Sequence, residues 1–225
     1  ALLEERGMQH VIEESEKYPL KNFIVLVPEQ FTMQTQKDLV SMHPRHGIMN
    51  IDVLSFARLA YRVFEETGTK QMQVLDDEGK NLILRKIAGD YENKLTVLKG
   101  NIKKLGYISE VKSVISEFTQ YDIGEEEIDE MLDHLDEDSR LYYKLKDIRL
   151  LYEGFQDYLR ERYITKEELL DVLNSQVKES ELLKNSVVVL DGFTGFTPVQ
   201  NRLILELMRC CKEVWVTVTM DEREN

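Results

Sequence analysis

The sequence predicts an α/β fold in which a parallel sheet is interrupted by an all-helical insertion. Strand-like apolar runs alternate with amphipathic helical stretches near both ends of the chain, as they do in parallel sheets. From Val74 to about Val177, by contrast, apolar residues recur with a helical period and no convincing strand is found. We therefore assign residues 1–67 and 181–225 to a sheet domain and residues 68–180 to a helical insertion.

The composition is that of a folded, acidic protein. Hydrophobic residues make up 42% of the chain and charged residues 32%, which excludes a disordered chain. The formal net charge of −13 argues against strong binding to a DNA backbone by this chain alone. Cys210 and Cys211 are adjacent, so a structural disulfide between them is geometrically unfavourable. No apolar run approaches the roughly 20 residues of a membrane span and no signal peptide is visible, so we expect a cytoplasmic protein.

The amino-terminal part alternates between helix and strand. The predicted elements are a helix over residues 2–17, a strand over Phe23–Val27, a helix to about Met42, a strand over Ile51–Leu54 and a helix over Phe56–Glu66. Ser55 is a suitable N-cap for the last of these helices. The spacing of His43 and His46 could suit a metal ion, but with no cysteine or acid nearby a surface loop is favoured.

The insertion contains helical patterns with well-marked starts. Its predicted helices span Asp76–Asp90, Ile108–Tyr121, Glu125–Leu135, Ser139–Arg162 and Lys166–Val177. Ser139 suits an N-cap, and Thr165 with Glu168 suits a capping box. The longest helix carries one apolar stripe, made of Tyr142, Leu145, Ile148, Leu151, Tyr152, Phe155 and Leu159. Such a stripe could stack nucleic-acid bases, but its spacing favours packing in a helical bundle.

The carboxyl-terminal part holds the candidate site. Val187–Leu190 predicts a strand buried on both faces, and Asp191 follows directly where that strand ends. A helix over Pro198–Cys210 and a strand over Val214–Thr219 come next. Nucleotide-binding α/β proteins hold magnesium with a carboxylate at such a strand end. A plain strand–Asp–Gly turn without chemistry is the commoner alternative.

Three sequence blocks resemble one helicase family. The stretch VVVLDGFTGFTPVQNRLILELM is similar to the Walker B region of superfamily-1A DNA helicases, which reads D-E-F-Q-D-T-N, two further residues, then Gln. The residues that fall in register with it are Asp191, Phe193, Thr197 and Gln200. VLSFARLAYRVF, at Val53–Phe64, resembles the T-F-H-S-x-A-x-R-I-L motif of the same enzymes, and Phe23–Gln34 lies where they carry their Ia motif.

A more specific resemblance is to the amino-terminal region of the B subunit of AddAB- or RexAB-type helicase–nucleases. It is carried by the sequence patterns V-P-E-Q-x-T, V-L-S-F-x-R-L-A and D-G-F-x-x-F-T-P, and it covers essentially the whole chain. The resemblance implies a RecA-like sheet with a degenerate motor. It also implies an A-type helicase–nuclease partner subunit, and DNA contact within a complex that resects double-strand ends for recombinational repair. The family's nuclease domain and iron–sulfur cluster are expected to lie outside this chain, which has two cysteines.

The resemblance assigns candidate roles to particular residues. The cofactor-side candidates are Asp191, as a vestigial magnesium position, with Pro28, Glu29, Gln30 and Gln200. The DNA-side candidates are Ser55, Phe56 and Arg62, although ordinary helix packing accounts for Phe56 equally well. Gly192 and Gly195 depart from the motif, because active relatives carry a glutamate and a second acid there. Losing a positioned base lowers a rate roughly 10²- to 10⁴-fold.

We therefore expect a degenerate helicase-like scaffold for contacts with DNA and the partner subunit. The chain begins without Met inside a predicted helix, and the family's phosphate loop would precede Ala1, so we expect a piece of a longer chain. ATP and magnesium binding by the intact subunit stays open; this chain alone is expected to bind neither cofactor and to lack ATPase activity. The alternatives are a truncated piece of an active superfamily-1 helicase and a non-enzymatic helical interaction module. We also expect Val214–Thr219 to be an open sheet edge through which copies self-associate.

Overall fold

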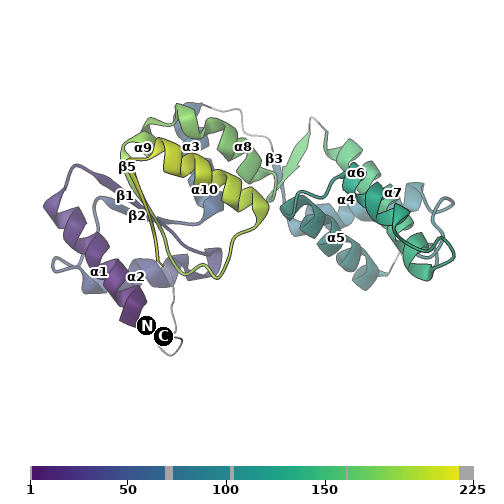
Figure 1. Ribbon diagram of the computed structural model, residues 1–225, viewed down its shortest axis with the longest axis horizontal. Coiled ribbons are helices and arrows are strands. Elements are labelled where there is room, and N and C mark those ends of the chain that lie inside the picture. Colours follow the sequence, from purple (N-terminus) through teal and green to yellow (C-terminus); the bar gives the residue numbers. More distant parts are fainter. Residues whose placement is uncertain (1, 69–72, 102–103, 161, 218–225) are drawn as a thin grey trace. The chain divides into compact units, whose positions relative to one another are not determined.

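The computed structural model describes residues 2–68, 73–101, 104–160 and 162–217 (Figure 1). The chain divides into two compact units. The sheet unit comprises residues 1–70, 170–196 and 200–225, and the helical unit comprises residues 71–169 and 197–199. Residues 170–180 fall with the sheet unit in this division, and the predicted domain limits at 68 and 180 stay a prediction.

The sheet unit is built on a parallel four-stranded sheet, as predicted. Its strands are β1 (Asn22–Leu26), β2 (Ile51–Leu54), β5 (Ser186–Leu190) and β6 (Glu213–Val216), in the spatial order β2-β1-β5-β6. Leu26 at the end of β1 is level with Leu54 on one side and Leu190 on the other. The carboxyl ends of these three strands therefore form one edge.

The two central strands are buried on both faces, which explains their continuous apolar sequences. Every residue of Val187–Leu190 is at most 3% exposed. The face with Phe23, Val25 and Val187 packs against the helices α1 (Leu2–Lys17) and α2 (Thr32–Met42). Figure 1 shows α3 (Phe56–Thr67) and α10 (Pro198–Cys210) on the opposite side of the sheet. The sheet is thus covered by helices on both faces, as parallel sheets require.

Three further elements lie just before β5 along the chain. They are α8 (Leu169–Gln176), the short 3-10 helix η2 (Val177–Glu179) and α9 (Glu181–Lys184). Glu66 near the end of α3 accepts hydrogen bonds from the Ser180 hydroxyl and, at 2.8 Å, from the Leu182 backbone N–H. This carboxylate therefore fastens the start of α9 to α3, although the two lie far apart in the sequence.

Among its described residues, the helical unit contains four helices and a short parallel ladder. The helices are α4 (Asp77–Asp90), α5 (Leu105–Gln120), α6 (Glu125–Asp133) and α7 (Arg140–Leu159). The expectation of an insertion without strands is wrong, because β3 (Gln73–Leu75) pairs with β4 (Tyr163–Thr165). Strands this short carry no measurable period, and their hydrogen-bond partners are distant in sequence, so the pattern gave no sign of them.

Helix starts agree with the capping residues read from the sequence. The Ser55 and Ser139 hydroxyls accept hydrogen bonds from the third backbone N–H that follows each, at 3.3 and 3.1 Å. The Thr165 N–H donates to the Glu168 carboxylate at 2.7 Å, and the Glu168 N–H donates back to the Thr165 hydroxyl at 3.3 Å. The helix that follows, α8, begins later than predicted, because this capping box closes on a turn that precedes Leu169.

The stripe on α7 is a packing surface. Ile148, Leu151, Tyr152, Phe155 and Leu159 are all buried in the core of the helical unit. Tyr142, at the start of the same stripe, instead contacts the ring of Tyr143, with centroids 5.4 Å apart. Five members of the stripe therefore cannot stack on nucleic-acid bases, and the packing interpretation is confirmed for them.

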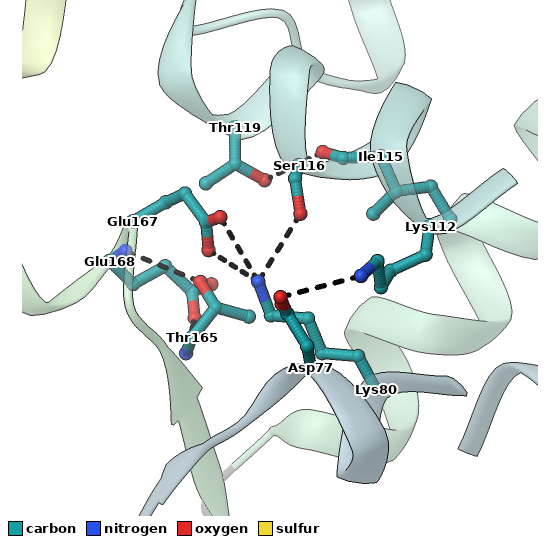
Figure 2. Close-up of polar contacts among 9 residues, drawn as sticks. All are labelled: Asp77, Lys80, Lys112, Ile115, Ser116, Thr119, Thr165, Glu167 and Glu168. Carbon is teal, nitrogen blue, oxygen red and sulfur yellow. Dashed lines mark hydrogen bonds and ion pairs between the residues drawn. The ribbon is translucent and has the colours of Figure 1, made fainter. Parts of the chain in front are cut away.

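A buried ion pair joins three elements of the helical unit (Figure 2). Lys80 of α4 is only 2% exposed, and its ammonium donates to both carboxylate oxygens of Glu167, at 3.0 and 2.7 Å. It also donates to the Ser116 hydroxyl of α5 at 3.2 Å. Burial by itself would raise the pKa of the Glu167 carboxyl, but the hydrogen bond and charge of Lys80 outweigh it and lower that pKa below 4.5.

Two further expectations concern surfaces. In the part of the chain that the structure describes, β6 is an edge strand, while Val218 and Thr219 of the predicted strand lie outside the described residues. Association through this edge stays a prediction. The His43 side chain is 8% exposed, and its Nδ1 accepts a hydrogen bond from the Arg45 N–H at 3.2 Å, as a structural loop residue would. No described helix combines the length and apolar character needed to cross a membrane.

Candidate ligand pocket at the carboxyl edge of the sheet

A pocket of about 580 Å³ lies where three neighbouring strands end. It is lined by Val27, Pro28, Glu29, Gln30, Phe31, Ser55, Phe56, Ala57, Gly192, Phe193, Thr194, Gly195 and Gln200. The first five follow β1, the next three follow β2, and Gly192 to Gly195 follow β5. Ligands of open α/β sheets bind outside the carboxyl ends of the strands, which makes this the candidate functional site.

Each wall of the pocket is fixed by local sequence. Pro28, with backbone angles φ −53° and ψ 143°, ends β1 and leads into the 3-10 turn Glu29–Phe31. Ser55 is 4% exposed, and its hydroxyl caps α3. Gly192 has φ +72°, a left-handed conformation that glycine adopts without steric cost. Gly192 therefore turns the chain sharply away from β5.

Aromatic rings dominate one side of the pocket. The rings of Phe56 and Phe193 have centroids 5.4 Å apart, and those of Phe193 and Phe196 are 5.1 Å apart. Phe56 is 6% exposed, so packing accounts for most of its surface, whereas Phe31, which also lines the pocket, is 48% exposed. The described lining thus combines the side chains of Phe31, Phe56 and Phe193 with a few polar groups.

The charge at this site is small. Among the described lining residues, Glu29 alone has an acidic or basic side chain, and its carboxylate lies 3.7 Å from the guanidinium of Arg58 on α3. Both side chains are more than half exposed, so the pair contributes little stability. No lysine or arginine belongs to the lining itself. The pocket therefore lacks the fixed positive charge that phosphate groups favour.

Asp191 does not point into this pocket. It is 6% exposed, and its Oδ1 accepts a hydrogen bond from the Thr217 hydroxyl just after β6. Its backbone N–H donates to the Leu26 carbonyl at 2.9 Å, which continues the β1–β5 ladder by one residue. In the described ranges, no three His, Cys, Asp or Glu side chains gather closely enough to hold a metal ion together. Thr217 thus occupies one of the two carboxylate oxygens of Asp191.

The structure groups most of the predicted site residues and separates two of them. Pro28, Glu29, Gln30, Ser55, Phe56 and Gln200 all line the one pocket. Arg62 does not line it; its guanidinium lies 3.1 Å from the Asp52 carboxylate instead. Phe31, Phe193 and Thr194 also line the pocket, although the sequence pattern assigns them no role there. The repeated Phe of FTGF next to the strand end was the available signal.

These features define a parallel α/β protein whose candidate ligand pocket lies at the carboxyl edge of the sheet. Comparison with known proteins places it more narrowly. The family model described as "ADDB, N-terminal" matches residues 4–225, so the chain belongs to that family.

Its relatives carry one name. The chain is 48% identical over 216 residues to the B subunit of the ATP-dependent helicase/deoxyribonuclease of Lachnoclostridium phytofermentans, covering 96% of this chain and 19% of the relative. It is 37% identical to the protein of that name in Alkaliphilus oremlandii, with the same coverage, and 39% identical to that of Clostridium kluyveri, covering 89% and 17%. The chain therefore spans about a fifth of the length of these curated relatives.

Proposed function

We propose that this chain is the amino-terminal, RecA-like part of a helicase/deoxyribonuclease B subunit, in which it serves as a scaffold that does not hydrolyse ATP. The intact subunit would work with an A-type subunit in the cytoplasm, processing double-strand DNA ends for recombinational repair. The names of the relatives support the parent enzyme, and the backbone at Gly192 supports the scaffold role.

Gly192 occupies the position at which the active superfamily-1A helicases that this chain resembles carry a catalytic glutamate. Its φ of +72° lies in the left-handed region, which costs roughly 1–2 kcal/mol for a residue with a Cβ. The turn after β5 is therefore built for glycine. Without a carboxylate there, no side chain at this position can orient or activate an attacking water.

Asp191 supports the same proposal. In a working motor this carboxylate would be oriented toward a magnesium ion beside the nucleotide. Here it is buried and engaged by the Thr217 hydroxyl. We therefore assign Asp191 a structural role at the end of β5, as a vestige of a magnesium position.

The pocket itself suits a nucleic-acid base better than a triphosphate. Phe31 and Phe193 line the pocket, and stacking of a base on an aromatic ring is worth about 1–3 kcal/mol. Gln30 and Thr194 supply exposed polar side chains at the same site. The lining contains no lysine or arginine to bind phosphates. We therefore assign the pocket to unpaired DNA within the complex, with nucleotide binding as the second candidate.

The experiment uses the intact B subunit in complex with an A-type subunit whose own motor has been inactivated. Asp191→Asn should leave both the residual ATP hydrolysis and the affinity for ATP within about twofold of the unsubstituted complex, because a vestigial site contributes neither. Phe31→Ala should weaken binding of a single-stranded DNA tail by roughly tenfold. Met33→Ala is the matched control, since Met33 is 60% exposed and lies outside the pocket lining.

Two outcomes would contradict the proposal. Robust DNA-stimulated ATP hydrolysis that Asp191→Asn abolishes would show an active motor in this subunit. Equal effects of Phe31→Ala and Met33→Ala on DNA binding would remove the pocket from the DNA path. Loss of ATP affinity in Phe31→Ala, with DNA binding unchanged, would favour the nucleotide candidate.

A further inference from the structure

A second hollow lies in the helical unit, between α6 and α7. It has a volume of about 700 Å³ and is lined by Ile123, Glu127, Glu130, Met131, His134, Leu135, Leu141, Lys144, Leu145 and Ile148. We call it the α6–α7 groove. It belongs to none of the helicase-like motifs, and its apolar area is exposed: Leu141 is 58% and Met131 is 40% exposed. Apolar side chains left in water beside a groove are typical of a surface that binds another protein.

The groove has two unlike walls because each helix contributes one row of side chains. The α7 row, at helical spacing, is Leu141, Lys144, Leu145 and Ile148. The α6 row is Glu127, Glu130, Met131 and His134. Ile148 is buried, so it forms part of the floor. An occupant would thus meet an apolar floor and wall on one side and carboxylates on the other.

The carboxylates along the groove differ from the others on the same helix. Glu125, Asp129 and Glu153 all lie within 3.1 Å of the guanidinium of Arg149, which balances that side of α6. Glu127 and Glu130 form no ion pair with a lysine or arginine of the described chain. The Glu127 carboxylate accepts a hydrogen bond from the Gly124 N–H at 2.8 Å, which holds it in place without neutralising it. The row that borders the groove is the one left uncompensated.

The loop that follows α6 strengthens this negative field. Asp136, Glu137 and Asp138 of this loop are exposed, as is Asp133 at the end of α6, and residues 125–139 contain no lysine or arginine. Lys144 is the single cation of the groove lining. Such a field repels DNA phosphates and anionic membranes. It also disfavours a second copy of a chain whose net charge is −13.

We propose that the α6–α7 groove binds an amphipathic helix of a protein partner that carries apolar anchors on one face and lysine or arginine beside them. The anchors would fill the space over Leu141, Leu145 and Ile148, and the basic side chains would reach Glu127 and Glu130. Helix-in-groove recognition uses this arrangement of apolar anchors at helical spacing. The inference rests on this groove alone and does not depend on the role proposed for the sheet unit.

The test uses the 225-residue chain and two synthetic helices. One is a leucine–lysine peptide of about 18 residues with leucines at i, i+3, i+4 and i+7, and the other replaces every lysine with glutamate. Fluorescence anisotropy measures affinity, and the methyl resonance of Met131 reports on where the peptide binds. The basic helix should bind and shift this resonance, and the acidic helix should bind at least about tenfold more weakly.

Matched variants separate the groove from general attraction. Leu141→Glu and Glu130→Lys should each lower the affinity for the basic helix by at least about tenfold. Their controls, Leu82→Glu on α4 and Glu126→Lys on α6, should change this affinity by less than about twofold. Leu82 is 66% exposed and Glu126 is also exposed, so the replaced types match, and neither lines the groove. Circular dichroism checks that every variant keeps its helices.

The proposal is overturned if the controls weaken binding as much as the groove variants, because the attraction is then not specific to the groove. It is equally overturned if the acidic helix binds as well as the basic one, or if the Met131 resonance stays unchanged at saturating peptide. Self-association that Leu141→Glu abolishes would assign the groove to a second copy of the chain instead.

Discussion

At the scale of single residues, the two glycines of the FTGF region have different reasons for being glycine. Gly192 has φ +72°, while Gly195 does not fall in the left-handed region and has open space around its Cα. A Cβ at position 192 would find its nearest atom, Pro28 Cδ, at an ordinary 3.8 Å. The constraint at Gly192 is therefore the backbone angle and not a lack of room.

This difference predicts the stability of two matched variants. Gly192→Ala should lower the free energy of unfolding by about 1–2 kcal/mol, because alanine is strained in the left-handed region. Gly195→Ala should leave it unchanged or raise it by up to about 1 kcal/mol, because alanine restricts the unfolded chain. Gly192→Asn should recover part of the loss, since asparagine tolerates this region. Urea unfolding measures all three, and equal values for Gly192→Ala and Gly195→Ala would contradict the assignment.

Asp191 shows the limit of prediction at this scale. A buried strand followed by an acid was enough to place the carboxylate at the carboxyl end of β5. Its orientation depends on Thr217, which belongs to a segment that pairs with β5 from a later part of the chain. No local pattern encodes that hydrogen bond. The sequence therefore placed the residue correctly but could not give the direction of its side chain.

At the scale of elements, the Lys80–Glu167 ion pair connects segments that are distant in sequence and that helical periodicity does not link. Lys80 belongs to α4, Ser116 to α5, and Glu167 follows β4. Lys80→Met should lower the free energy of unfolding by about 3–5 kcal/mol, because it leaves a buried carboxylate without its cation. The matched control is Lys112→Met, which removes the 3.4 Å pair with the 64% exposed Asp77 and should cost less than about 1 kcal/mol. Similar losses in the two variants would show that burial does not matter at Lys80.

The same pair predicts a dependence of stability on pH. The pKa of Glu167 is lowered in the folded chain from 4.5, so its carboxyl binds fewer protons there than in the unfolded chain. The stabilisation is therefore complete above pH 4.5 and is lost as the pH falls through the lower, folded value. The difference in unfolding free energy between the unsubstituted chain and Lys80→Met should shrink as the pH falls through this window. A constant difference would exclude Glu167 as its source.

Elements were predictable where their signal was local. The strand Ile51–Leu54 and the helix Pro198–Cys210 have the predicted limits, because apolar periodicity and a Pro start mark them within a few residues. The ladder of β3 and β4 was missed because its stability comes from pairing between segments far apart in the sequence. The α6–α7 groove was missed for a related reason, since its two rows face each other only after the helices pack.

At the scale of the whole molecule, the division into two units predicts separate responses to damage. The helical unit has its own apolar core, and both residues of the Lys80–Glu167 ion pair belong to this unit. Hydrogen exchange should therefore speed up in α4, α5 and α7 of Lys80→Met, while β1 and β5 keep the protection of the unsubstituted chain. Equal acceleration in both units would show that the chain unfolds as one cooperative body.

Trp215 is an intrinsic fluorescent probe of the sheet unit. It is the single tryptophan, and its ring centroid lies 4.9 Å from that of His10 on α1 and 6.1 Å from that of Phe23 on β1. An indole in such contact emits differently from one in water, so the emission spectrum reports whether the first helix is seated on the sheet. The intrinsic fluorescence of the protein thus reports on the contact between α1 and the sheet. Stopped-flow fluorescence can therefore time the docking of α1 without any added dye.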